Sequence, residues 1–473
     1  MSTNWGVDSR AATAAAYAIL GAVLLWSRLA DLGKGFWFDE STFVSHFVRK
    51  GPREIIAGPD LSHELYGVLA WTTGALIGES EFAYRLLSTV PFIAGVVLVT
   101  AWLHARVNPG SGLLFLFLAT VSPLLLDITR QARGYGLAFL AMSVLIVSAL
   151  EANRTGRTLP VAAMCVSGVV GTWTLPQLSI GFLATGAVLA TDRVLRRPAI
   201  VGLALSMAAI GAWYAPHIGQ IHAASQIEDG RQISTVWLVS GPIDQVLLPA
   251  LLFIEGTVLI PGVIWLPLLL LSAVVIGSSP LVRERGSALI LGLGPIATIL
   301  VLWIGQAYII PRYLSFLLVP LFMFLASGAS SILARLTRRQ ATLRSVACVV
   351  AICALAFNFA AIAPDVVRLP KEATRDAAEI IETRSAPTTP VLTRLSLPEG
   401  LVFYLGRPVH ALRSSEVVAR VCGSHVAVAY VTQSFSLPAV AVPCLDRSGV
   451  RHFRFKQYTR GDEMNVWFVP PPA

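Results

Sequence analysis

Eleven apolar runs, each close to the length of a membrane-crossing helix, constrain this chain more than any other feature. A crossing helix needs about 20 apolar residues, or about 17 at the low end. The runs lie at 11–30, 85–104, 112–127, 136–151, 159–175, 177–191, 198–216, 261–279, 286–304, 313–330 and 344–362. Only 13% of the residues are charged, against about 25% in soluble domains. The sequence therefore predicts a polytopic α-helical membrane protein with about 11 spans, and it excludes a soluble or a disordered chain.

The positions of the charged residues predict how the chain is oriented. The N-terminus and alternate loops hold 13 basic and four acidic residues, whereas the opposite loops before Asp365 hold 10 basic and 13 acidic residues. Loops rich in Lys and Arg stay in the cytoplasm. We therefore expect a multi-pass protein of the plasma (inner) membrane, with a cytoplasmic N-terminus and an extracytoplasmic segment after Pro364. The net charge of +9 then reflects orientation rather than a nucleic-acid partner.

The segments outside the membrane predict two domains. Residues 1–364 form the multi-span domain, whose first extracytoplasmic loop, 31–84, carries eight acidic residues. Residues 365–473 alternate short β-rich runs with helical patterns, which is typical of a small α/β domain. The expected strands are 390–393, 425–432, 450–458 and 465–469, and the expected helices are 371–382 and 414–421. Cys422 and Cys444 face an oxidising compartment, so they either form a disulfide or remain two buried thiols.

The motif Phe36-Trp-Phe-Asp39-Glu40, just after the first span, is the sharpest local signal. Two adjacent carboxylates follow three aromatic residues. One interpretation is an aromatic belt with solvated acids behind it. The other is that the aromatic residues hold the carboxylates at the membrane surface, close to a lipid-borne substrate. A carboxylate placed there accepts the proton of an acceptor hydroxyl as a general base.

Further acidic candidates lie on the same side of the membrane. His63-Glu64 comes later in the same loop and precedes the apolar run Leu65–Gly78. At 14 residues this run is too short to cross, and it suits a helix that lies along the interface or dips into it. Asp127 ends the third predicted span.

Arginines stand on the outer side of two spans, against the positive-inside trend. Arg130, Arg133 and Tyr135 precede the fourth span, and Arg312 and Tyr313 begin the tenth. Guanidinium groups bind phosphate bidentately. These arginines therefore either bind the phosphate of an anionic lipid or pair with nearby acids such as Asp127.

Four motifs together resemble the GT-C superfamily of polytopic glycosyltransferases, most closely its protein O-mannosyltransferase and lipid A aminoarabinose transferase branch. They are Phe36-Trp-Phe-Asp39-Glu40, Glu79-Ser-Glu81-Phe-Ala-Tyr-Arg85-Leu-Leu-Ser88, Gln131-Ala-Arg133-Gly-Tyr135 and Pro311-Arg312-Tyr313-Leu314. Their order and span positions agree with that branch over about residues 11–330. A further element of the branch, His-Pro-Pro-Leu-Tyr, reads His63-Glu64-Leu65-Tyr66 here, and the resemblance does not extend to the tail.

The resemblance implies an inverting glycosyltransferase that uses a dolichyl- or polyprenyl-phosphate sugar at the outer face of the plasma membrane. It implies that the catalytic residues are Asp39 and Glu40. A second acidic site for the acceptor then comprises His63, Glu64 and Asp127. The lipid phosphate is bound by Arg133, Arg312, Arg130, Tyr135 and Tyr313. The partners are then the lipid-linked donor, a glycan, lipid or protein acceptor, and membrane lipids, with no nucleic acid. A phosphate leaves readily, so the chemistry requires no cofactor, although a divalent metal is compatible with the resemblance.

Two other classes of protein stay open. A lipid or glycan transporter or flippase usually places polar groups or broken helices at mid-membrane, whereas the charges here concentrate in the outer loops. A scaffold that binds lipid phosphate without catalysis shares every motif and differs only in activity. The Ala/Val/Leu-rich spans are typical of a bacterial cell-envelope protein.

Overall fold

The computed structural model describes residues 5–57, 63–215, 272–304, 311–336, 343–369, 373–393, 399–412, 416–433, 445, 449–456 and 463–471. The chain folds into two compact units. The helical unit comprises residues 1–30, 56–70 and 85–363, and the sheet unit comprises residues 31–55, 71–84 and 364–473. The predicted first loop, 31–84, is therefore divided between the two units.

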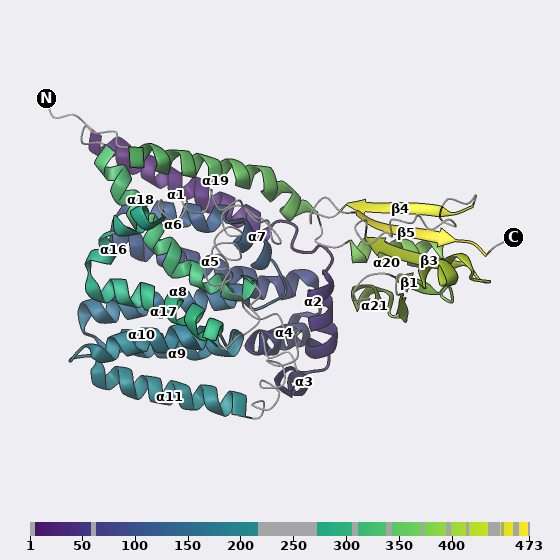
Figure 1. Ribbon diagram of the computed structural model, residues 1–473, viewed down its shortest axis with the longest axis horizontal. Coiled ribbons are helices and arrows are strands. Elements are labelled where there is room, and N and C mark those ends of the chain that lie inside the picture. The colour runs from purple at the N-terminus through teal and green to yellow at the C-terminus, as the bar shows by residue number, and fades with distance from the viewer. Residues whose placement is uncertain are drawn as a thin grey trace. The chain divides into compact units, whose positions relative to one another are not determined.

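Six helices in the described part of the chain are long and apolar enough to cross a membrane. They are α1 (Trp5–Leu29), α5 (Glu81–Arg106), α8 (Tyr135–Thr155), α11 (Arg196–Tyr214), α18 (Leu318–Leu336) and α19 (Leu343–Arg368). The other apolar helices are α6 (Pro109–Val121), α9 (Thr158–Thr174), α10 (Leu178–Thr191) and α17 (Arg285–Ile304). Most of these helices run roughly parallel or antiparallel to one another (Figure 1). The chain is a multi-pass α-helical membrane protein, as predicted.

The predicted number of 11 spans is not confirmed. Ten of the predicted runs coincide with described helices, some of which are too short to cross alone, and the run 261–279 lies largely outside the described residues. The third predicted span is two helices, α6 and α7 (Pro123–Ile128). Pro123 has no backbone N–H and therefore begins a new helix. The Ser122 hydroxyl caps this helix by accepting from the Leu125 N–H over 3.3 Å.

Helix α8 is the centre of the helical unit. In its most apolar 18-residue stretch, 78% is buried inside the protein, against 17% in the corresponding stretches of α1, α11 and α19. A helix that is apolar on all sides is stable when other helices surround it. The outer helices instead present large apolar side chains such as Ile19, Leu205 and Phe357, which is the surface that lipid requires.

Small residues let the helices around α8 approach closely. A Cβ added at Gly171 in α9 would lie 2.8 Å from the Leu178 side chain of α10 and 3.1 Å from Ala141 of α8. Without aliphatic bulk at such positions, helix backbones in a membrane pack directly against one another. This packing holds the ends of α8 and α9, where the candidate site lies.

The C-terminal residues form a small α/β domain within the sheet unit, as predicted. Its strands are β1 (Val391–Thr393), β2 (Val409–Ala411), β3 (Val428–Gln433), β4 (Arg451–Lys456) and β5 (Glu463–Val469). Their order is β2-β1-β3-β5-β4, with β1 parallel to both its neighbours and β5 antiparallel to both of its own. The helical segments are α20 (Thr374–Arg384), α21 (Glu399–Leu405) and η5 (Val418–Cys422). Strand β2 and helix α21 are elements that the sequence patterns missed.

Alternation along β3 explains why both faces of this sheet are covered. Ala429 and Val431 pack with apolar residues of α20 and α21, whereas Val428 and Tyr430 pack on the opposite face. Successive strand side chains point to opposite faces, so an uninterrupted apolar strand needs a layer on each side. Helices α20 and α21 supply one of these layers (Figure 1).

The predicted first loop is mostly helical. It contains α2 (Phe38–Phe43), η1 (Val44–Val48), α3 (Pro52–Ala57) and α4 (Glu64–Ile77). Helix α4 has 14 residues, which is too short to cross a membrane, in agreement with the prediction for 65–78. Lys34, before α2, donates through Nζ to the carbonyl oxygens of Val366 and Leu369 over 2.6 Å each, which caps the end of α19.

Candidate functional site

His63 is fixed between two helices of the helical unit. Its side chain is fully buried, and its φ of +71° is a left-handed conformation that few non-glycine residues adopt. Its backbone N–H donates to the carbonyl oxygen of Thr174, at the end of α9, over 2.8 Å. Its Nδ1 accepts from the backbone N–H of Gly134, just before α8, over 3.2 Å. The surrounding helices therefore hold a strained residue in place, which is common at functional sites.

Two tyrosines from distant segments pack around this histidine. The Tyr135 ring lies edge-on to the His63 ring at 4.7 Å, and the Tyr313 ring lies 6.3 Å from it. The two tyrosine rings are themselves stacked, with their centroids 6.3 Å apart. Tyr135 begins α8 and Tyr313 lies in η4 (Pro311–Leu317), so residues almost 180 positions apart form one cluster.

Arg133 and Arg312 bring positive charge to the same histidine. Burial, followed by the charges of Arg133 and Arg312, lowers the pKa of His63 well below its ordinary value of 6.5. The imidazole is therefore neutral at pH 7, in agreement with Nδ1 as an acceptor. The Arg133 side chain is buried, and the Arg312 guanidinium lies 5.9 Å from the Tyr313 ring centroid. We call His63, Arg133, Tyr135, Arg312 and Tyr313 the His63 cluster.

The His63 cluster has the chemistry of an anion site. Its two guanidinium groups are permanently charged, and its histidine is neutral, so the cluster is cationic. A guanidinium that is shielded from water binds a phosphate or carboxylate through short, charge-assisted hydrogen bonds. The tyrosine rings add apolar walls with hydroxyl donors.

Glu64 has a different partner from its neighbour His63. It begins α4, is buried, and accepts a hydrogen bond through Oε2 from Nε1 of Trp213, near the end of α11. The Trp213 ring is stacked on Trp173 of α9, with 4.5 Å between centroids. A buried carboxylate needs such a donor. The structure therefore places Glu64 against a pair of stacked tryptophans at the ends of α9 and α11.

Arg130 holds the end of α1. Its Nη1 and Nη2 donate to the carbonyl oxygens of Ser27 and Ala30 over 2.5 and 2.7 Å. Arg28, which no motif singled out, is also buried and donates to the carbonyl oxygens of Ala119 and Thr120 in α6. Arginines near a helix C-terminus satisfy its last carbonyl groups. Asp127, in α7, is buried.

The two acids of the sequence motif occupy different environments in the sheet unit. Trp37 precedes α2, and the Glu40 carboxylate reaches back to accept from the Trp37 backbone N–H over 3.2 Å. This contact is one half of a capping box, which stabilises the helix start. Glu40 is only 1% exposed, whereas Asp39 is partly exposed. The structure thus assigns Glu40 a local structural contact at the start of α2.

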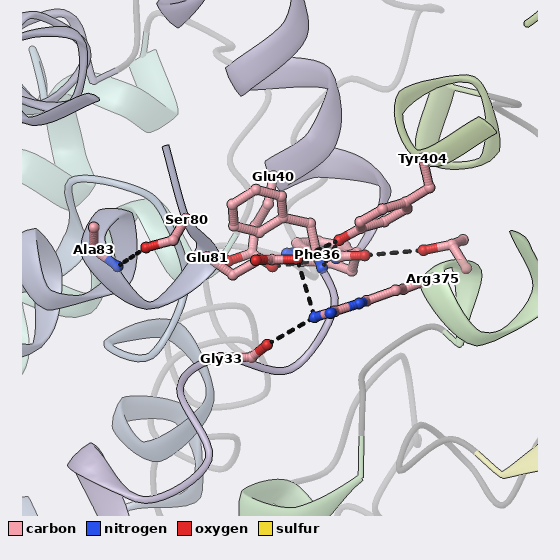
Figure 2. Close-up of polar contacts among 10 residues, drawn as sticks. Gly33, Phe36, Glu40, Ser80, Glu81, Ala83, Arg375 and Tyr404 are labelled. Atoms are coloured by element: carbon pink, nitrogen blue, oxygen red, sulfur yellow. Dashed lines mark hydrogen bonds and ion pairs between the residues drawn. The ribbon is translucent and has the colours of Figure 1, made fainter. Parts of the chain in front are cut away.

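The residues before the acids are held by side chains of α20 and α21, as Figure 2 shows. The Phe36 backbone N–H donates to Oη of Tyr404 over 2.5 Å, and the Phe36 carbonyl oxygen accepts from Oγ1 of Thr374 over 3.0 Å. Oε1 of Glu81 accepts from Oη of Tyr404 and from Nη1 of Arg375 over 3.3 and 3.4 Å. No sequence signal pointed to Tyr404 or Arg375, because their partners lie about 300 positions away.

The remaining predictions concern cysteines and metal ions. Cys422 is disulfide-bonded, and Cys444 lies outside the described residues, so the pairing of these two residues stays a prediction. Within the described ranges, no group of three His, Cys, Asp or Glu side chains is placed to hold a metal ion.

Among the predicted site residues, the structure brings together the five of the His63 cluster. It places Asp39 and Glu40 in the other unit.

Comparison with known proteins supports the fold. No family model matches the sequence, and no curated protein sequence matches it. The crystal structure of ArnT from Cupriavidus metallidurans in the apo state has a TM-score of 0.56 at 13% identity, covering 97% of this chain and 98% of that chain. ArnT bound to undecaprenyl phosphate has a TM-score of 0.51 at 13% identity, covering 99% and 98%. The apo oligosaccharyltransferase of Archaeoglobus fulgidus has a TM-score of 0.49 at 10% identity, covering 86% and 65%.

The two ArnT structures are the basis for assigning the fold, because their similarity extends over nearly the whole of both chains. ArnT is a GT-C glycosyltransferase. This fold agrees with the resemblance that the four sequence motifs showed over about residues 11–330. This chain has the fold of the GT-C superfamily of membrane glycosyltransferases.

Proposed function

We propose that this protein is an inverting glycosyltransferase that moves a sugar from a polyprenyl-phosphate donor to an acceptor hydroxyl at the outer face of the plasma membrane. The observation that carries the proposal is the His63 cluster, in which two arginines from distant segments act on one neutral histidine. A donor whose leaving group is a lipid phosphate needs cationic groups and an apolar surface rather than a nucleotide site. ArnT, which shares the fold, was crystallised with undecaprenyl phosphate.

In this proposal Arg133 and Arg312 bind the donor phosphate. Negative charge grows on the phosphate as the bond from the sugar C1 to the phosphate oxygen breaks. Fixed guanidinium groups in a site shielded from water stabilise that charge without reorganising. Tyr135 and Tyr313 line the same cluster, and the neutral His63 adds no charge to it. Arg130 already donates to α1 and acts by holding the loop.

Asp39 is the proposed general base. It takes the proton of the acceptor hydroxyl as the acceptor oxygen attacks C1, and the phosphate leaves from the opposite side, so the configuration at C1 inverts. Glu40 keeps the first turn of α2 in place through Trp37. Glu64 and Asp127 stay candidates for the acceptor side, and a divalent metal is compatible with the chemistry but not required by it.

The test is transfer by the purified protein from a panel of polyprenyl-phosphate sugars. We expect cleavage of one donor class, and Asp39→Asn should lower kcat by about 10²–10⁴-fold, the usual contribution of general-base catalysis. Glu40→Gln is the matched control, since its amide oxygen can still accept from Trp37, and it should cost less than tenfold. Equal, mild losses in the two variants would refute Asp39 as the base. Failure to cleave any donor, with binding retained, would favour a transporter or scaffold.

A further inference from the structure

Both backbone polar groups of Phe36 form hydrogen bonds with side chains of the C-terminal domain. Tyr404 of α21 accepts from its N–H, and Thr374 of α20 donates to its carbonyl oxygen. The Phe36 ring packs edge-on against Phe403 at 5.7 Å and stacks on Tyr84 at 6.3 Å. Phe36 lies three residues before Asp39, so its backbone position largely fixes where α2 begins.

Glu81 determines how the Tyr404 hydroxyl is oriented. Because the Tyr404 hydroxyl donates its proton to Oε1 of Glu81, its oxygen accepts the Phe36 N–H (Figure 2). The same Glu81 oxygen accepts from Arg375, whose Nη1 also donates to the carbonyl oxygen of Gly33. The two contacts of the Tyr404 hydroxyl are partly buried, where linked hydrogen bonds strengthen one another, whereas the Arg375 contacts are exposed.

Gly35 shows that this approach of α20 is close. A Cβ added at Gly35 would lie 2.7 Å from Cβ of Arg375, a separation that a side chain cannot accept without displacement. The chain is therefore bound at Gly33, at Phe36 and, through Glu40, at Trp37. These contacts leave the first turn of α2 little freedom to shift.

We propose that Tyr404, with Glu81 and Arg375, is a positioning clamp that holds the Asp39 carboxylate in place for catalysis. The clamp rests on the proposed function, since it assumes that Asp39 is the base. It gives the C-terminal domain a part in the reaction through the segment that leads into Asp39. A misplaced general base costs rate steeply, because catalysis depends on its geometry.

The experiment compares Tyr404→Phe with Tyr430→Phe in the full-length protein. Tyr404→Phe removes the hydroxyl and keeps the ring. Tyr430→Phe removes a buried hydroxyl from β3 in the same domain, where the ring stacks on Trp467. We expect Tyr404→Phe to lower kcat about tenfold with little change in the donor KM, and to speed hydrogen exchange in a peptide covering 33–40. Tyr430→Phe should do neither. Glu81→Gln keeps an acceptor for Tyr404 and should fall between the two.

The outcomes separate the clamp from the proposed function. If exchange in 33–40 is unchanged in Tyr404→Phe, or if kcat falls equally in Tyr430→Phe, the clamp is overturned. If exchange speeds up but kcat stays the same while Asp39→Asn abolishes transfer, the positioning role fails and the enzyme assignment stands. If Asp39→Asn itself leaves transfer unchanged, the proposed function of Asp39 fails first, and the clamp for it fails too.

Discussion

Gly134→Ala adds a single methyl group at a crowded point of the candidate site, directly beside His63. A Cβ on Gly134 would lie 2.6 Å from Cγ2 of Thr174, 2.9 Å from Nδ1 of His63 and 3.2 Å from Cβ of Tyr66. Thr174, His63 and Tyr66 are all fully buried. The glycine thus allows the loop before α8 to lie directly against the His63 backbone and ring.

The neighbours of Gly134 have little room to retreat, and this sets the size of the effect. Thr174 is β-branched, so its side chain is stiff about χ1. His63 is tied to Thr174 through its N–H and to Gly134 through Nδ1. Adding a methylene-sized group to a packed core costs about 1–3 kcal/mol, and we expect the upper part of this range. Displacing the His63 ring also moves the surroundings of Arg133, so the Kd for a polyprenyl phosphate should rise at least about tenfold.

The assay pairs Gly134→Ala with Gly211→Ala, in α11. An added Cβ at Gly211 meets no atom within 4 Å, and exchanging Gly for Ala inside a helix gains up to about 1 kcal/mol. Thermal unfolding in detergent and binding of undecaprenyl phosphate should therefore change in Gly134→Ala and not worsen in Gly211→Ala. If the two variants melt and bind alike, the close contact between Gly134 and His63 does not exist in solution, and the geometry of the His63 cluster must be abandoned.

Two further predictions concern the charges of the cluster. Arg133→Ala and Arg312→Ala should each impair donor use far more than acceptor affinity, and their effects should be non-additive in the double variant, because both groups act on one anion. Substitution by Lys at either position should restore only part of the loss, and Arg106→Ala is the control. Near-normal donor kinetics in both alanine variants would mean that the phosphate binds elsewhere. The lowered pKa of His63 means that the unfolded chain binds a proton that the folded chain rejects. Stability from this residue is therefore complete above about pH 6.5 and falls below it, by at most about 1.4 kcal/mol per pH unit. Asn tolerates positive φ, so His63→Asn should fold and should weaken the dependence of the melting temperature on pH between pH 7 and 5. Equal slopes of melting temperature against pH in variant and wild type would contradict a lowered pKa for His63.

The helical part of the fold could be predicted because membrane burial leaves a direct trace in the sequence. Apolar runs mark helices in lipid whatever their neighbours are. The exceptions have local causes that the runs hide. Pro123 divides the third run into α6 and α7 without interrupting its apolar character. In the C-terminal domain, β2 has only three residues and one buried side chain, so its pattern is too short to detect.

The site could be predicted only as far as single motifs reach. Arg133, Tyr135, Arg312 and Tyr313 were candidates because basic and aromatic residues at the predicted outer end of a span need an explanation. The contacts that join them to His63 depend on how α8, α9 and η4 pack, and that is set by glycines such as Gly134 and Gly171. Tyr404 and Arg375 carry no local signal, because an ordinary tyrosine and arginine acquire a role only through partners at Phe36, Gly33 and Glu81.

Two adjacent carboxylates at the start of a helix cannot do the same work. Neighbouring side chains on a helix point about 100° apart, so only the residue at the third helical position reaches back to the N-terminal turn, as Glu40 does to Trp37. The preceding carboxylate, Asp39, is partly exposed. One acid thereby holds the turn on which the other is mounted, and the C-terminal domain holds the segment that leads into it. A motif that reads as two equivalent acids in the sequence places them in different environments in the folded chain, and we propose that Asp39 is the base and Glu40 its support.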